Sequence, residues 1–194
     1  MANISSNVSE FLAKVAQGVK PNMFEVEIAF PLLGLQVDNK LVNMMCKSAA
    51  LPASSLGTIE VPFRGRSVKI AGDRTFDNWT ATFINDKDMK TRGYFETWLN
   101  KMNSHEGNTA EAFNPAEGGQ RYTADLFVTQ IEKDASEKGS NLRKYKLWYA
   151  FPASVSQIDL AYDSNDQIEE FTVEFQYSYW TVEEGDAKNS DIIK

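Results

Sequence analysis

The chain has 194 residues, of which 42% are hydrophobic and 24% are charged, the balance of a folded globular domain. Its formal charge of -7 argues against a protein that grips nucleic acid along its length, because such proteins are normally basic. One cysteine and one histidine exclude an intramolecular disulfide framework and a zinc site of the Cys/His kind. No apolar stretch approaches the ~20 residues of a membrane span, and the polar N-terminus does not resemble a signal peptide.

The N-terminal segment has the pattern of an amphipathic helix. Asn7 and Glu10 resemble a capping box, and Gly18 and Pro21 mark the stop. The residues at helical spacing are Val8, Phe11, Leu12, Val15 and Val19. We expect a helical arm within residues 1–20, with its apolar stripe packed on the domain or on a neighbouring subunit.

From residue 22 the hydrophobic period changes to two, which is typical of strands with one wet face. Strands are expected at residues 24–30, 41–49 and 79–83. Between them, residues 57–70 alternate on both sides of a turn at Arg64-Gly65-Arg66, which predicts a β-hairpin.

The second half of the chain begins with a predicted helix over residues 88–102, capped by Asp86 or Asp88 and packed inward through Phe95, Leu99 and Met102. A polar loop at residues 103–119 follows. Further strands are expected at residues 122–128, 145–151, 158–162 and 171–179, before a polar C-terminal tail at residues 181–194. The pattern predicts a single domain over residues 1–194, an antiparallel, mainly-β sandwich or barrel with a flanking α-helix and an N-terminal helix.

Catalytic chemistry finds little support in the residues. His105 lies in a flexible loop context without a motif around it, and Cys46 lies in a strand-like run where a buried, inert thiol is the usual outcome. Residues 163–174 resemble a calcium loop, but Ile168 stands where such a loop needs glycine. We therefore expect no enzyme activity, no metal and no cofactor.

Charge is distributed unevenly along the chain. The segment around the hairpin is basic through Arg64, Arg66, Lys69 and Arg74, whereas residues 163–191 contain nine acids and one lysine, Lys188. Opposed patches on one subunit suit a head-to-tail contact of the kind that builds rings and filaments. Scattered solvated charge is the alternative that the charges alone leave open.

The last predicted strand has one apolar and one polar face. The polar side chains are Glu170, Thr172, Glu174 and Gln176. Such a face could line an aqueous channel, which needs roughly 16 strands or more. One chain of this size cannot supply them, but a ring of subunits can.

Several motifs together resemble one known family. They are AGDRTFDNWT at residues 71–80 followed by Asn85-Asp86, PNMFEV at residues 21–26, CKSAALP at residues 46–52, and DSNDQI at residues 163–168. These segments resemble the tail tube proteins of T-even-like contractile-tailed bacteriophages, and the resemblance covers most of the chain from residue 22 to residue 180. The loops at residues 31–39 and 103–119 and both ends depart from the family pattern.

The resemblance implies a non-enzymatic virion protein of the phage tail, made in the host cytoplasm. Similar proteins form hexameric rings whose strands join into one inner barrel. These rings stack into a tube that contacts the sheath, baseplate and tail-terminator proteins, and double-stranded DNA passes through it into the host. An inner-tube subunit of a related contractile injection system, or a tube paralogue near the baseplate, is the nearby alternative.

Two hypotheses about residues follow. The hairpin at residues 57–70 stacks rings: its apolar residues need a partner surface, and its basic residues meet carboxylates of the next ring. The residues assigned to this interface are Ile59, Val61, Phe63, Arg64, Arg66 and Lys69. The polar face of the last strand, from Glu170 to Gln176, lines the lumen. An internal hairpin of the same sandwich is the competing view, and a monomeric ligand-binding β-sandwich or a carboxylate-based hydrolase remains a distant alternative.

Overall fold

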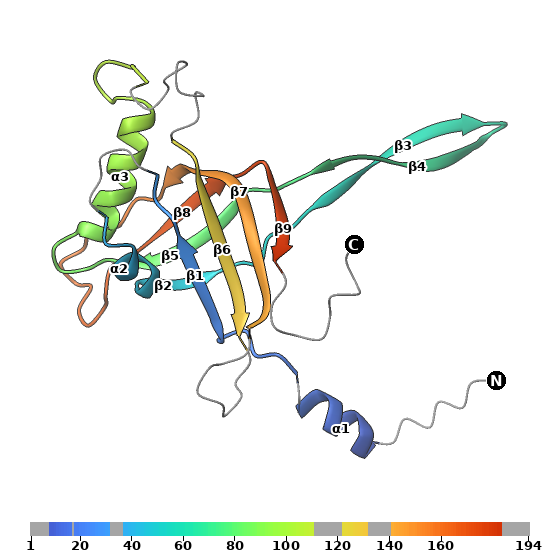
Figure 1. Ribbon diagram of the computed structural model, residues 1–194, viewed down its shortest axis with the longest axis horizontal. Coiled ribbons are helices and arrows are strands. Elements are labelled where there is room, and N and C mark those ends of the chain that lie inside the picture. The colour runs from blue at the N-terminus through green and yellow to red at the C-terminus, as the bar shows by residue number, and fades with distance from the viewer. Residues whose placement is uncertain (1–7, 17, 32–36, 111–121, 132–140, 184–194) are drawn as a thin grey trace.

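The computed structural model describes residues 8–16, 18–31, 37–110, 122–131 and 141–183 (Figure 1). The helices are α1 (Val8–Ala16), α2 (Asn39–Met44) and α3 (Lys90–Met102). The strands are β1 (Phe24–Ile28), β2 (Cys46–Ala49), β3 (Ser55–Phe63), β4 (Arg66–Thr75), β5 (Trp79–Ile84), β6 (Ala124–Ile131), β7 (Asn141–Val155), β8 (Glu170–Gln176) and β9 (Tyr179–Glu183). The expected mainly-β antiparallel class with a flanking helix and an N-terminal helix is confirmed.

Seven strands form one antiparallel sheet in the order β1-β6-β7-β8-β5-β2, with β9 also paired to β7, and the sheet does not close on itself. The long strand β7 is shared: its first part pairs with β6 and β9, and its last residues pair with β8. At this change of partner Tyr149 has a φ of 56°. A left-handed residue with a register shift beside it bends a strand, so the sheet folds into two facing halves.

The core lies between these two halves and α3. On β5 and β8 the residues in alternate positions are buried, and Phe95 and Trp98 of α3 lie against them with both side chains fully buried. The Phe95 ring centroid is 5.0 Å from that of Phe83 and 6.1 Å from that of Phe171. The predicted inward packing of α3 therefore holds for Phe95. The next buried position is Trp98, whereas Leu99 and Met102 are only partly buried.

The predicted hairpin forms a sheet of its own. Strands β3 and β4 pair only with each other and extend far from the body as a long arm (Figure 1). Arg64 and Gly65 at its tip have φ values of 46° and 81°. Positive φ at both central residues is the type I′ geometry, which matches the twist of the strands it joins. The alternative of a hairpin inside the sandwich is wrong.

Four local predictions are corrected. Residues 39–44 form the helix α2 instead of the start of a strand, because Asp38 accepts a hydrogen bond from the Leu41 N–H at 3.1 Å and Val42 is fully buried. Residues 158–162 are not a strand. The last strand breaks before Tyr179, where β9 turns to pair with β7. Residues 181–183, predicted to belong to the tail, lie in β9, and residues 184–194 lie outside the described residues.

The start of α3 also differs from expectation. Its N-cap residue is Met89, in a left-handed conformation and without a side-chain cap. Asp86 nevertheless accepts a hydrogen bond from the Thr91 N–H at 2.7 Å. Burial raises the pKa of this carboxyl, but hydrogen bonds from backbone N–H groups, that of Thr91 foremost, outweigh that effect and lower the pKa below its ordinary value.

Candidate assembly surfaces

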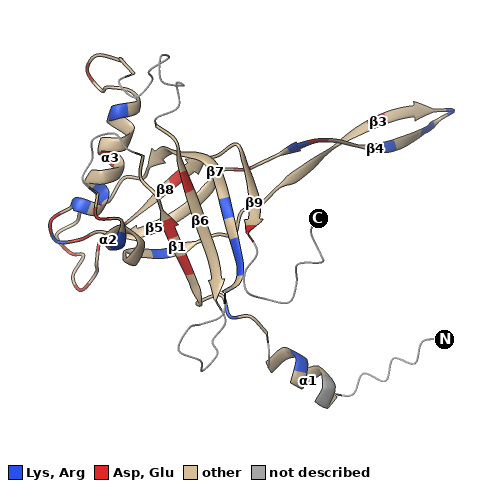
Figure 2. Ribbon diagram, in the orientation of Figure 1, with Lys and Arg blue, Asp and Glu red and all other residues tan. Residues whose placement is uncertain are grey.

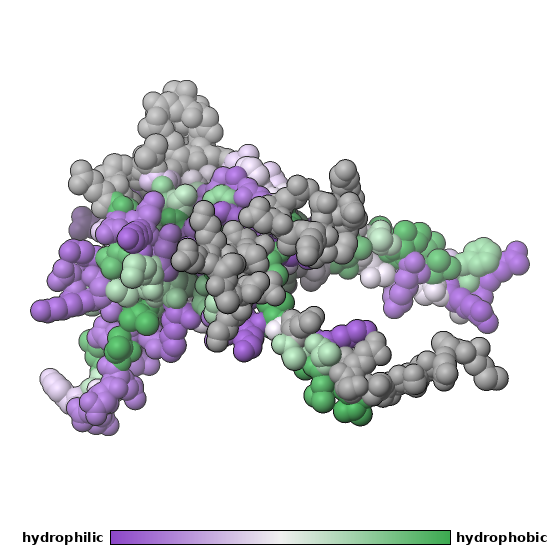
Figure 3. Space-filling view, turned by 60° about the horizontal axis from the view of Figure 1, so that its bottom comes forward, coloured by the Kyte–Doolittle hydropathy of each residue, from purple (hydrophilic) through white to green (hydrophobic). Residues whose placement is uncertain are grey.

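The hairpin arm has one apolar and one polar face. The cross-strand pairs Ile59–Ile70 and Val61–Val68 share one face with Phe63, while Glu60 and Lys69 form an ion pair on the other at 3.5 Å. The residues of the apolar face, Ile59, Val61, Phe63, Val68 and Ile70, are each between 42% and 62% exposed. Figure 3 shows this hydrophobic side along the projecting arm. A two-stranded ribbon with an uncovered apolar face is unstable in water, so the arm needs a partner.

The tip of the arm is basic (Figure 2). The Arg64 guanidinium lies over the Phe63 ring, 5.4 Å from its centroid. Neither Arg64 nor Arg66 forms an ion pair with a described carboxylate, whereas Lys69 pairs with Glu60 on its own arm. Of the three cations predicted for the interface, Arg64 and Arg66 at the tip are therefore available to a partner. Lys69 is already paired with Glu60.

The polar side chains predicted on the last strand lie together on one exposed face of β8. Glu170, Glu174 and Gln176 are exposed and Thr172 is half-buried, while the residues between them are fully buried. Neighbouring strands extend this face with hydroxyl groups. The Thr82 and Thr172 hydroxyls lie 3.3 Å apart, and Ser154 donates a hydrogen bond to Glu174 at 3.2 Å.

Sequence reasoning missed the members of this face that come from other strands. Thr82 alternates with the buried Ala81 and Phe83 on β5, and that alternation was the available signal. The Lys47 ammonium donates to Glu170 at 2.7 Å, so one of the two proposed channel acids is neutralised within the subunit. Glu174 carries the remaining negative charge.

The outer face of the other half of the sheet has a different chemistry. Lys144 and Lys146 of β7 pair with Glu27 at 3.1 Å and with Asp125 at 3.0 Å. The Lys146 ammonium also lies 3.5 Å from the Trp148 ring centroid. This half thus presents lysine–carboxylate ion pairs and the Trp148 ring, whereas the β8 half presents hydroxyls, the Lys47–Glu170 pair and the Glu174 carboxylate.

The N-terminal arm is helical from Val8 to Ala16, and its apolar stripe is exposed. Of the two sites predicted for this stripe, packing on the body is therefore excluded for the described residues. The stripe is a second apolar surface available to a neighbouring subunit.

The two residues considered for catalysis, Cys46 and His105, have no reactive environment in the structure. Burial raises the pKa of Cys46 to about 12, opposed only by a smaller effect of hydrogen bonding with the backbone of Ser48, so the thiol stays protonated at neutral pH. His105 is an exposed residue whose backbone N–H donates to Asn100 at 3.1 Å. Among the described residues there is no group of three potential metal ligands, and no described helix is long and apolar enough to cross a membrane.

Known proteins share both this sequence pattern and this fold. Residues 19–183 match the family described as phage tail tube protein. The tail tube protein gp19 of Enterobacteria phage T4 is 35% identical over 161 residues, covering 83% of this chain and 90% of that protein. The tail tube protein of Serratia phage KSP90 is 28% identical, covering 89% and 94%.

Solved structures agree in fold at low sequence identity. A chain in the sheath–tube complex of an extracellular contractile injection system, in the extended state, superposes with a TM-score of 0.56 at 19% identity, covering 92% of this chain and 99% of that one. A chain of the anti-feeding prophage baseplate superposes with a TM-score of 0.58 at 12% identity, covering 85% and 95%. The fold is thus shared with chains of these contractile assemblies. The chain belongs to the phage tail tube protein family and is a structural component of the phage tail.

Proposed function

We propose that six copies of this chain form a ring and that rings stack into the tube through which the phage genome passes. The observation that carries this proposal is the β3–β4 arm, which projects from the body with an uncovered apolar face. Together with membership of the tail tube family, it marks a subunit that is completed only by other copies. The role is structural, without a catalytic step, and we expect synthesis in the host cytoplasm.

Strand edges on the β8 half support the ring. Strand β2 ends the sheet and has four residues. Residues 151–155 of β7 pair with β8 on one edge, and no described strand pairs with the opposite edge. Two edges of similar length allow β2 of one copy to pair with residues 151–155 of the next. Four strands from each of six copies make about 24, above the ~16 that leave an aqueous channel.

The chemistry of the two outer faces supports assigning the lumen to the β8 half. A channel that lets DNA slide should offer neither unpaired cations, which bind phosphate, nor aromatic rings, on which bases stack. The face with Thr82, Thr172 and Glu174 meets this requirement. The other face carries the Trp148 ring beside Lys146, so we assign it to the outside of the tube, where the sheath lies.

Electron microscopy of the purified protein tests this proposal. We expect rings or tubes with a central pore by negative stain, and large species by sedimentation that persist on dilution. The protein should bind no DNA on the inner wall at physiological salt. A compact monomer at all concentrations would contradict the proposal and favour the ligand-binding sandwich instead.

A further inference from the structure

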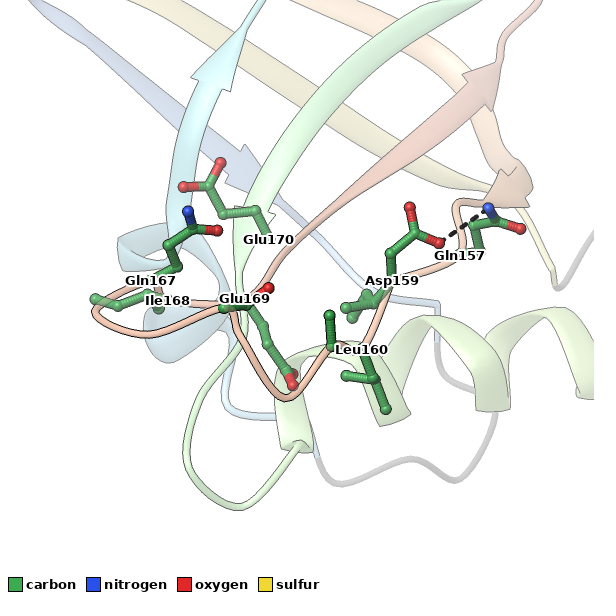
Figure 4. Close-up of a pocket in the computed structure, with 10 residues that line it drawn as sticks. Gln157, Asp159, Leu160, Gln167, Ile168, Glu169 and Glu170 are labelled. Carbon is green, nitrogen blue, oxygen red and sulfur yellow. Dashed lines mark hydrogen bonds between the residues drawn. The ribbon is translucent and has the colours of Figure 1, made fainter.

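The loop between β7 and β8 forms a groove at the end of the molecule opposite the hairpin tip. Figure 1 shows this loop beside α2, with the arm projecting at the other end of the longest axis. The groove has a volume of about 650 Å³. Both arms of the loop line it, with Gln157, Asp159 and Leu160 on the outgoing arm and Gln167, Ile168 and Glu169 on the returning arm (Figure 4).

The groove combines exposed apolar side chains with carboxylates that form no ion pair with the described residues. Leu160 is 80% exposed and Ile168 is 70% exposed. Asp159 accepts a hydrogen bond from Gln157 at 3.2 Å, and Glu169 accepts one from Asn85 at 3.1 Å. Neither carboxylate forms an ion pair with a described lysine or arginine, so both keep their charge toward solvent.

The hairpin tip has the complementary composition. It carries an exposed aromatic ring, Phe63, beside the guanidinium of Arg64, with Arg66 across the turn. The groove offers an exposed aliphatic surface, Leu160 and Ile168, beside two carboxylates. Apolar contact at the centre with charge pairs around it is the usual anatomy of a specific protein interface.

We propose that the groove of residues 157–169 is the receptor for the hairpin tip of a second copy in the adjacent ring. This inference rests on the proposed tube and names the surface on which stacking occurs. Tip and groove lie at opposite ends of one chain, so each copy gives its tip to one neighbour and receives another tip. A contact of this kind is heterologous and propagates without closing. Six such contacts between two rings act together, so weak individual pairs suffice.

Disulfide trapping tests the contact directly. The chain has a single cysteine, so Arg64→Cys and Asp159→Cys in a Cys46→Ser background place one thiol on the tip and one in the groove. Oxidation of assembled protein should give a ladder of covalent multimers that collapses to monomer on reduction. The matched control pairs Arg64→Cys with Glu25→Cys, an exposed position on β1, and should give no ladder.

Charge exchange provides a second readout. Arg64→Glu and Asp159→Lys should each lower the yield of tubes at least about tenfold at matched protein concentration, since each replaces attraction by repulsion at every tip–groove contact. The double variant should recover most of the yield. The groove assignment is wrong if the Cys46→Ser parent forms tubes, the thiol pair gives no covalent ladder, and the double charge variant does not recover the yield. The proposal that the protein forms a tube would then still hold. If the parent forms no tubes, the proposed function itself fails.

Discussion

Phenylalanine occurs in two opposite settings in this chain. Phe95 is fully buried between α3 and the sheet, where its ring lies within 6.1 Å of the rings of Phe30, Phe83, Phe171 and Phe175. Phe63 is 62% exposed on the arm, and the only ring contact described for it is with Arg64. The same side chain thus stabilises the subunit at one position and, in our proposal, the assembly at the other.

This contrast predicts separable effects of one substitution. Phe95→Ala should lower the free energy of unfolding by about 3–5 kcal/mol, because it removes a buried ring and leaves a cavity. Phe63→Ala should change it by less than about 0.5 kcal/mol, as exposed positions do, yet reduce tube formation. Urea unfolding below the assembly concentration and sedimentation above it measure the two quantities. Equal loss of stability in both variants would show that the arm packs on its own body.

At the scale of elements, two glycines differ in the space around them: Gly72 in the arm faces the opposite strand closely, whereas Gly93 in α3 faces open space. A Cβ added at Gly72 would lie 3.1 Å from the carbonyl carbon of Gly57 on the opposite strand, at a register shift near the base of the arm. A Cβ added at Gly93 in α3 would meet nothing within 4 Å. An alanine at position 72 would therefore collide with backbone atoms, whereas an alanine at position 93 would fit without a collision.

We therefore expect opposite outcomes from two Gly→Ala changes. Gly93→Ala should raise the free energy of unfolding by about 0.5–1 kcal/mol, because alanine is the better helix former, and leave assembly unchanged. Gly72→Ala should force β3 and β4 apart at the base of the arm and redirect the tip, lowering tube yield with little change in the unfolding midpoint of the body. If Gly72→Ala forms normal tubes, the direction of the arm is set by its contact with the next ring and not by the close approach of β3 and β4 at its base.

At the scale of the whole molecule, the distribution of charge between the two outer faces decides how DNA would meet the tube. Glu174 is the proposed channel acid that has no cationic partner among the described residues, whereas Glu170 forms an ion pair with Lys47. A negative wall repels phosphate, and a positive wall would bind it through counterion release.

Glu174→Lys should therefore slow genome release several-fold from tails assembled with the variant, while tail length stays the same. The effect should weaken as salt rises, because counterion release is then less favourable. Glu25→Lys, on the other half of the sheet, serves as the control and should leave release unchanged. Equal release rates for wild type and Glu174→Lys would move β8 out of the channel wall.

The sequence pattern was sufficient to predict the structure wherever residues close together in the sequence determine it. The alternation in β8, the turn at Arg64-Gly65 and the helical spacing of α1 each appear as predicted, because side-chain period and turn chemistry act over a few residues. The family motifs likewise identified the class of protein from short segments.

The tertiary structure decided what depends on distant partners. Burial of Val42 turned a predicted strand into α2, and the bend at Tyr149 let β7 pair with one half of the sheet and then the other. The bend at Tyr149 leaves no periodic signal, because it depends on residues far away in the chain. The Asp38 cap of α2 is local, but the burial of Val42 depends on distant partners. The placement of the hairpin tip and the acidic groove at opposite ends of the molecule also depends on the whole path of the chain, although the charges themselves could be seen in the sequence.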